Sequence, residues 1–389
     1  MHLDPMMLNI TIALFVALLF GFMAVRAGLP IIIAYILTGV VMGPSMLGMI
    51  TDTQMVERIG ELGVVMLLFF VGMEVSIPRL MERWKVAIVG TTVQILISVG
   101  VCVTLTASFG LPTNLGILFG FVISLSSTAV VLKMLQDANE LDLPFGQNAL
   151  GVLLVQDISI VPMMIVLGLL GSGEVNLIDL SRQVIGGIAV LSLVIWLMRT
   201  GKFHVPDFLT SSFEKRVLMG LMLCLGASSL TSWLGLSPAL GAFLSGLVLA
   251  SSDQSDWVEE HLESVHIIFV AIFFLSIGLL VDINYLMEHV TVVLGATLLV
   301  FLFNSGSNIL VMRAMGETWQ MALITAGLLS QIGEFSFLLA AVGLNAGILD
   351  HDLHKMTVLV IALTLLLSPF WMMLVNRIAR QDGVLTAGK

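Results

Sequence analysis

One acidic side chain stands in the middle of a long apolar stretch. Residues 146–170 read GQNALGVLLVQDISIVPMMIVLGLL, with Gln156 and Asp157 near the centre. About twenty-five apolar residues can form a somewhat tilted transmembrane helix, which would place this pair near the bilayer midplane. An ionised carboxylate at that depth costs several kcal/mol unless it binds a partner. We therefore predict that a metal cation and a proton compete for Asp157, as in a secondary antiporter.

Small polar residues interrupt two other apolar stretches at mid-depth. The first, within 114–136, contains SLSSTAVV, and the second, within 319–345, contains LLSQIGEFSF. Runs of hydroxyl, amide and glycine allow a transmembrane helix to break, which frees carbonyl groups and half-helix ends for ion binding. The residues predicted on this ground to bind the cation or to support the broken helix are Ser126, Ser127, Thr128, Gln331, Gly333 and Glu334.

Each of these assignments has a plainer alternative. The hydroxyl residues can be small packing residues, and the Gln156 amide can bond a neighbouring helix instead of coordinating a cation. Glu334 would lie near helix dipole ends, so we expect it first to balance their partial charges, with ion contact as the alternative. Asn304 and Asn308, one turn apart, either line the site or bond helix to helix.

The composition identifies the class of protein that must position these residues. Of the 389 residues, 58% are hydrophobic and only 11% are charged, and the mean hydropathy is +1.08. Soluble domains carry about 25% charged residues, so this is a polytopic membrane protein. The sequence shows no basic stripe for nucleic acid, and both cysteines lie in apolar stretches. We expect no cofactor, because no cofactor-binding motif is visible.

Apolar runs of about twenty residues predict an all-α protein with about thirteen transmembrane helices. If the N-terminus is outside, all Lys and Arg residues except Arg58, Arg182 and Lys355 fall on the inner side, which favours a cytoplasmic C-terminus. We expect a bacterial inner membrane. The predicted spans are 8–26, 29–49, 59–77, 84–109, 114–136, 146–170, 178–199, 215–234, 237–252, 262–281, 288–313, 319–345 and 353–376.

Two sequence matches at nearly one offset predict an internal duplication. GMEVSIPRLME at Gly72 matches GLLVDINYLME at Gly278, and LPIIIAYILTG at Leu29 matches LSPALGAFLSG at Leu236. With six spans in each half and one between them, the halves enter the membrane from opposite sides, as inverted repeats of transporters do. The predicted domains are a first repeat at 8–170 with ion-site helices 114–136 and 146–170, a linker helix at 178–199, and a second repeat at 215–380 with the broken helix 319–345.

The duplication distinguishes residues that both halves share from residues that occur in one half alone. The position that corresponds to Asp157 is Leu363 or Thr364, while Pro162 corresponds closely to Pro369. The proline recurs and the acid does not, which disfavours the alternative that Asp157 only ties helices together.

Several motifs in order resemble Kef-type potassium/proton antiporters of the monovalent cation/proton antiporter-2 family. They are LTGVVMGPSMLG, LGVVMLLFFVGMEV, SLSSTAVV, LLVQDISIVPMM and GLLSQIGEFSFLLA, and the resemblance covers essentially the whole chain. It implies a dimerisation domain and a mobile core domain in which 114–136 and 319–345 cross as broken helices. It also implies a homodimer with elevator-like alternating access and Asp157 as the ion-binding carboxylate.

The resemblance further suggests which ion is exchanged. Sodium-exchanging relatives commonly have Asp or Asn before the key Asp and a basic residue on the stretch corresponding to 288–313. Here Gln156 and Asn304 occupy these places, which is similar to the potassium-type subgroup and implies electroneutral exchange. Kef-type proteins often continue into a cytosolic nucleotide-binding domain, which we expect to be absent from this chain.

Three other functions remain as alternatives. A Na⁺/H⁺ antiporter would use the same fold, because residue types alone do not fix ion selectivity. A K⁺ channel-like efflux protein is disfavoured, since the sequence has no TVGYG-like filter. An intramembrane aspartyl enzyme would need two facing carboxylates, and Asp157 has only Glu334 as a poor second. We therefore predict a transporter and not an enzyme.

Overall fold

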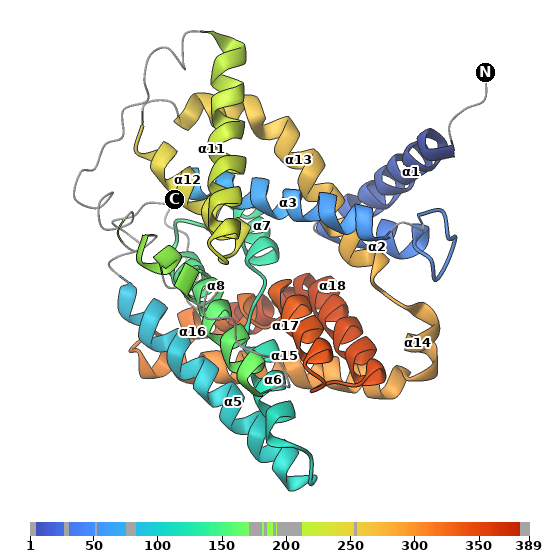
Figure 1. Cartoon of the computed structure of the whole chain (residues 1–389), viewed down its shortest axis with the longest axis vertical. Helices are drawn as coiled ribbons and strands as arrows, with labels where there is room; N and C mark the ends of the chain where they lie inside the picture. Colours follow the sequence, from blue (N-terminus) through green and yellow to red (C-terminus); the bar gives the residue numbers. More distant parts are fainter. Residues whose placement is uncertain are drawn as a thin grey trace. The chain divides into compact units, whose positions relative to one another are not determined.

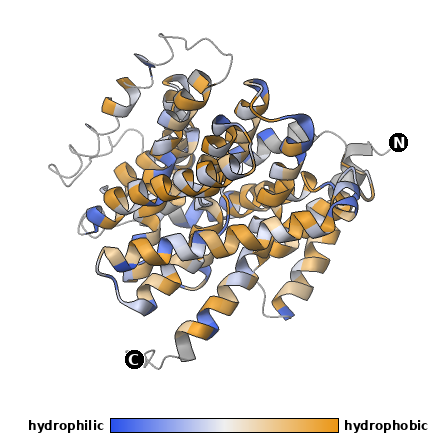
Figure 2. Cartoon of the chain, turned by 90° about the horizontal axis from the view of Figure 1, so that it is seen from below, coloured by the Kyte–Doolittle hydropathy of each residue, from blue (hydrophilic) through white to orange (hydrophobic). Residues whose placement is uncertain are grey.

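The computed structural model describes residues 5–26, 31–50, 53–74, 83–170, 181–182, 185–189, 192, 212–252 and 255–381. Within these ranges the chain is helical, with turns and short irregular segments and no strand. Seven of the described helices are long and apolar enough to cross a membrane. Hydrophobic residues predominate along most of the described helices (Figure 2). The predicted all-α membrane class is confirmed.

The helices form two compact units, and each unit takes one segment from either half of the chain. The first comprises Met1–Met81 and Val175–Leu280. In this unit α3 packs against α12 and α13, while α2 contacts α1 and α13 (Figure 1). Its helices are α1 (Pro5–Arg26), α2 (Ile31–Met42), α3 (Thr53–Glu74), α11 (Phe213–Trp233), α12 (Pro238–Ala250) and α13 (Ser255–Leu279).

Two pairs of glycines bring helices of the first unit into backbone contact. Gly39 of α2 faces Gly278 of α13, and a Cβ on either would collide with a carbonyl oxygen of the other helix. Gly72 of α3 faces Gly246 of α12 in the same way. Gly246 lies 207 positions after Gly39, and Gly278 lies 206 positions after Gly72. The first-half residue of each pair therefore corresponds to the second-half residue of the other pair. Two halves related by a two-fold axis would produce this relation.

The second unit comprises Glu82–Glu174 and Val281–Lys389. Here α5 packs on α6, and α15, α16, α17 and α18 pack on one another in several pairs (Figure 1). Its helices are η1 (Val86–Gly90, a π-helical turn), α5 (Thr91–Ser108), α6 (Thr113–Ser124), α7 (Thr128–Asp137), α8 (Pro144–Leu170), α14 (Ile283–Glu288), α15 (Val290–Ala314), α16 (Trp319–Leu328), α17 (Phe335–Asn345) and α18 (His351–Gln381).

Both predicted helix breaks occur, and both belong to the second unit. The span 114–136 consists of α6 and α7 separated by residues 125–127, and the span 319–345 consists of α16 and α17 separated by residues 329–334. The predicted linker helix 178–199 lies largely outside the described residues. Each of the other predicted spans overlaps a described helix, while residues 29–30 and 75–77 lie outside the described residues. The helix at 29–49 is shorter than predicted, because Pro44 disfavours helical geometry at Gly43 and α2 ends at Met42.

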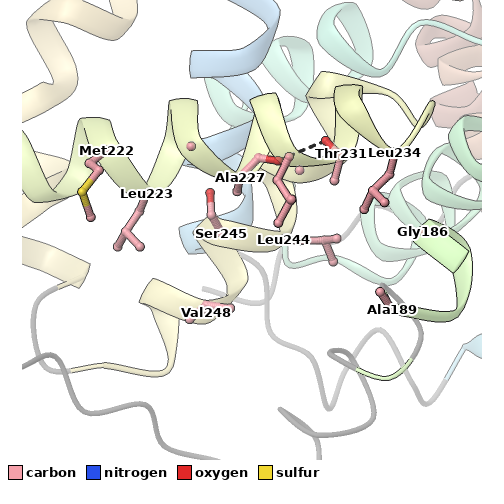
Figure 3. Close-up of a pocket in the computed structure, with 13 residues that line it drawn as sticks. Gly186, Ala189, Met222, Leu223, Ala227, Thr231, Leu234, Leu244, Ser245 and Val248 are labelled. Atoms are coloured by element: carbon pink, nitrogen blue, oxygen red, sulfur yellow. Dashed lines mark hydrogen bonds between the residues drawn. The ribbon is translucent and has the colours of Figure 1, made fainter. Parts of the chain in front are cut away.

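An apolar cavity of about 460 Å³ lies in the first unit (Figure 3). It is bounded by α11, α12 and residues 186–189. Its two hydroxyl groups, on Thr231 and Ser245, donate to carbonyl oxygens of their own helices. The cavity is therefore lined by hydrocarbon and bonded hydroxyls, and the predicted site residues lie in the other unit.

Candidate cation-binding site

The break between α6 and α7 is bridged by Gln156 of α8. A broken helix leaves backbone groups unpaired, and each costs several kcal/mol in hydrocarbon unless a partner takes it up. Gln156 Oε1 accepts from Ser126 N–H at 2.9 Å, and Gln156 Nε2 donates to Ser124 O at 2.9 Å. Gln94 of α5 donates to the same carbonyl at 3.1 Å and accepts from Gln156 Nε2 at 3.4 Å. Both ends of both buried amides are therefore engaged.

The second break is held by the same kinds of contact from different residues. Ile332 N–H donates to Thr364 Oγ1 of α18 at 3.1 Å, and Asn304 Nδ2 of α15 donates to Ser330 O at 3.2 Å. The two backbone groups lie 206 positions after their counterparts in the first break (332 − 126 and 330 − 124). Equivalent backbone groups are thus freed in both halves of the chain, and different side chains take them up.

The two breaks lie against each other. A Cβ on Gly333 would come within 2.5 Å of Ser126 O, so a larger residue would force the two segments apart. Backbone and hydroxyl groups join them across the crossing. The hydrogen bonds are Gly333 N–H to Leu125 O at 2.7 Å, Ser126 Oγ to Leu329 O at 2.9 Å and Ser336 Oγ to Val122 O at 2.7 Å.

The N-terminus of α7 faces the carboxylate of Glu334. The Ser127 hydroxyl accepts from Val130 N–H at 3.2 Å as the N-cap of α7, and it donates to Glu334 Oε2 at 2.7 Å. The backbone N–H of Ala129 also faces this carboxylate. A helix N-terminus carries roughly half a positive charge, so this is a favourable place for an anion. Glu334 is itself the N-cap residue of α17, so its carboxylate lies near the N-termini of two helices.

Asp157 is the central residue of α8 and is 4% exposed. The Thr128 hydroxyl lies 3.3 Å from each carboxylate oxygen, which is long for a hydrogen bond between oxygen atoms. The carboxyl group of Glu334 lies close enough to interact electrostatically with Asp157. Within the described part of the chain, neither carboxylate forms an ion pair with a basic side chain. Among the described residues, Asp157 therefore has no counter-charge.

This donor set suits reversible binding of a small positive charge. Carboxylate and hydroxyl oxygens are hard ligands of the kind that hard cations prefer, and the carboxylate also accepts a proton. Among the described residues there is no group of three or more His, Cys, Asp or Glu side chains arranged to hold a metal ion.

Two polar residues at the site were not assigned a role from sequence. Gln94 is the only amide in the span 84–109, which was a usable signal for a buried contact. Thr364 was noted only as the position corresponding to Asp157, and its contact with the second break depends on how α18 packs. Asn308, in contrast, donates to Asn304 O of its own helix at 2.9 Å, so its nitrogen does not reach the break.

Most of the chain matches one protein family and several named relatives. The family described as sodium/hydrogen exchanger, transmembrane, matches residues 10–373. The iron transporter MagA of Paramagnetospirillum magneticum is 37% identical over 95% of this chain and 85% of its own length. K(+) efflux antiporter 6 of Arabidopsis thaliana is 31% identical over 88% of this chain, but the chain spans only 59% of that relative.

The fold also matches a solved structure. The sodium proton antiporter MjNhaP1 from Methanocaldococcus jannaschii is 21% identical and aligns over 98% of both chains with a TM-score of 0.65. At this identity the match supports the helical arrangement and not the ion that is carried.

Proposed function

The chain belongs to the sodium/hydrogen exchanger family, as its resemblance to Kef-type antiporters predicted, and we propose that it exchanges K⁺ for H⁺ at Asp157. The family consists of cation/proton antiporters that use no cofactor, and the chain is not an enzyme. The observation that carries the proposal is the isolation of Asp157, which is buried at the centre of α8, near a second carboxylate and without a described basic partner.

The proposed mechanism follows from the free energy of a buried charge. A bare carboxylate crosses an apolar barrier only at a cost of several kcal/mol, so the empty ionised form does not switch sides. Binding one proton or one K⁺ at Asp157 removes that cost. Because the two ligands compete for the same oxygens, obligatory electroneutral exchange follows without further machinery.

We assign the other site residues to supporting roles. Ser127 and Thr128 place hydroxyls beside the two carboxylates, and Thr128 is the proposed second ligand of the cation. Ser126 and Gln156 hold the first break in place, since their polar atoms are taken up by backbone groups. Gly333 permits the crossing, and Glu334 offsets the N-terminal charge of α7.

The proposed architecture has thirteen transmembrane helices in two inverted repeats, 8–170 and 215–380, joined by the linker helix 178–199. Support comes from the two glycine contacts, whose residues correspond to one another at the offset between the halves, and from the helix breaks at matching positions. Both α8 and α18 also contain an internal proline, Pro162 and Pro369. We propose a homodimer in a bacterial inner membrane, with an outer N-terminus, a cytoplasmic C-terminus and alternating access by the unit that holds both breaks.

The choice of K⁺ rests on relatives and on residue types. A relative named for K⁺ efflux and the amide Asn304 on α15 both favour K⁺. The Na⁺/H⁺ alternative is supported by the structural match to a sodium proton antiporter, and a relative named as an iron transporter adds Fe²⁺ as an ion to test.

The test is the collapse of a pH gradient in proteoliposomes on adding K⁺, Na⁺, Rb⁺, Li⁺ or Fe²⁺ in turn. We expect K⁺ to give the fastest collapse and Asp157→Asn to abolish it. Asp137→Asn is the matched control, because Asp137 forms only a partly exposed helical ion pair with Lys133. Continued exchange by Asp157→Asn would refute the assignment, and K⁺ flux without proton coupling would favour a channel.

A further inference from the structure

Buried polar atoms are fully bonded at the first break and are not at the second. Gln94 and Gln156 use both ends of their amides at the first break. At the second break Gln331 is 0% exposed, and neither its Oε1 nor its Nε2 has a hydrogen-bond partner in the described part of the chain. The two breaks therefore differ, because the side-chain amides at the first are bonded and the Gln331 amide at the second has no partner among the described residues.

Asn304 and Asn308 of α15 add two more unpaired amide oxygens. Both side chains are buried, and both use their nitrogen in a hydrogen bond while Oδ1 has no partner among the described residues. Asn304 bonds to Ser330 O, which is adjacent in sequence to Gln331, so the three amides belong to one region. The Thr325 hydroxyl on α16 is also buried without a partner there. We call Asn304, Asn308, Thr325 and Gln331 the amide cluster.

Such a group is costly unless something binds to it. Nearly all buried backbone polar groups and the large majority of buried side-chain polar atoms have a hydrogen-bond partner, and an unpaired one destabilises the folded state. In the amide cluster, three amide oxygens need a donor or a positive charge, whereas two groups, Gln331 Nε2 and the Thr325 hydroxyl, can donate. The excess of oxygens selects a cation, or water that donates hydrogen bonds.

Electrostatics favours the cation. Glu334 follows Gln331 by three residues, and its charge also acts on Asp157. The two carboxylates together carry up to two negative charges, and the N-terminus of α7 offsets only about half of one. One bound proton or K⁺ at Asp157 leaves a negative potential nearby. Neutral amide oxygens coordinate K⁺ as the carbonyl oxygens of potassium filters do.

We propose that the amide cluster is a second binding site for a partly dehydrated monovalent cation, separate from Asp157. Asn308 Oδ1 and Asn304 Oδ1 stand one helical turn apart, where side-chain neighbours are about 5–6 Å from each other and able to share one ion. Gln331 Oε1 and Thr325 Oγ1 supply the other protein ligands. The choice of a monovalent cation rests on the proposed function.

The site is tested in a protein that has lost Asp157. Asp157→Asn is purified, and its thermal midpoint is measured in KCl and in choline chloride at equal ionic strength. We expect K⁺ to raise the midpoint, since a ligand that binds only the folded state stabilises it. Adding Asn308→Leu or Gln331→Met should abolish the shift. Gln331→Met breaks no hydrogen bond among the described residues, so its midpoint in choline should stay the same or rise. Asn308→Leu also loses the hydrogen bond from Nδ2 to Asn304 O, so its midpoint in choline should fall slightly.

Matched controls separate binding from general damage. Asn345 is exposed at the end of α17, so Asn345→Leu makes the same chemical change outside the amide cluster and should keep the K⁺ shift. Gln94→Leu removes an amide that is fully bonded, and it should lower the midpoint equally in both salts.

Two outcomes would overturn the proposal. One is the absence of any K⁺ shift in Asp157→Asn, as expected if water alone fills the cluster, and the other is a shift that survives both Asn308→Leu and Gln331→Met. If Asp157→Asn does not fold, the unaltered protein is crystallised or imaged with Tl⁺ in place of K⁺. We expect two peaks of ion density, one at Asp157 and one at the amide cluster. A single peak at Asp157 would contradict the proposal. Ion exchange by Asp157→Asn is measured in a separate assay. A failure of the proposed function can therefore be distinguished from a failure of the second binding site.

Discussion

Ser127 of the first break donates a hydrogen bond of 2.7 Å to Glu334 at the second break, 207 positions further along the chain. The contact joins the two breaks at their crossing. If the two halves are inverted repeats, as proposed, positions that nearly correspond can touch only close to the two-fold axis. Asp157 lies beside the crossing through Thr128.

Ser127→Ala should destabilise the protein and slow exchange. The change removes both the N-cap of α7 and the hydrogen bond to Glu334, each of which contributes about 1 kcal/mol. The midpoint of thermal unfolding in detergent measures the loss. Ser127→Thr keeps the hydroxyl and should retain most of the stability, whereas equal loss in both variants would mean that the hydroxyl is not what matters.

Glu334→Gln should weaken cation binding more than it changes the fold. Glutamine still accepts from Ser127, but it removes the negative charge that acts on Asp157. We expect KM for K⁺ to rise about tenfold, which corresponds to about 1.4 kcal/mol, with a smaller change in maximal rate. Kinetics in proteoliposomes at several K⁺ concentrations check this. An unchanged KM would show that Glu334 acts only on the α7 N-terminus.

Exchange should depend on pH through competition at Asp157. As the pH falls, protons occupy the carboxylate and the apparent KM for K⁺ should rise, by about tenfold per pH unit in the acid limit because the two ligands exclude each other. The maximal rate at saturating K⁺ should change less. Initial rates of proton flux measured over a range of pH and K⁺ test this, and a constant KM throughout would contradict a shared site.

Gln94→Leu and Gln156→Leu should be strongly coupled. Gln156→Leu leaves Gln94 Oε1 without a partner, which costs about 1–3 kcal/mol for a buried polar group, whereas Gln94→Leu removes one hydrogen bond of Gln156 Nε2 and leaves its other contacts in place. The double variant should therefore lose less stability than the sum of the two single losses, and a double-mutant cycle of unfolding free energies measures the difference. Additive losses would show that the two amides act independently.

Gly333→Ala should abolish exchange or prevent folding. The new Cβ would meet Ser126 O at 2.5 Å and push the two breaks apart, since a backbone carbonyl cannot move aside as a flexible side chain does. Gly306→Ala in α15 is the matched control, because a Cβ there has nothing within 4 Å. We expect normal expression and exchange from the control. Normal exchange by Gly333→Ala would mean that the crossing tolerates separation.

The sequence alone determined the membrane class, most helix positions, the two breaks and the residues worth testing. Length and hydropathy set the helices, because a segment in hydrocarbon must satisfy its backbone groups internally. A run such as SLSSTAVV marks a break because small polar side chains can take up freed backbone groups. The sequence also identifies Asp157, because an ionisable side chain among apolar neighbours is costly in the membrane and marks a functional site.

Only the tertiary structure decided which polar atom bonds to which. Whether the Gln156 amide faces an ion or the backbone depends on where Ser124 and Gln94 lie, and Gln94 belongs to a different helix. The same holds for Thr364 at the second break and for the unpaired oxygens of the amide cluster. Residue types fix which atoms need partners, whereas the packing of helices distant in sequence fixes which partners they find.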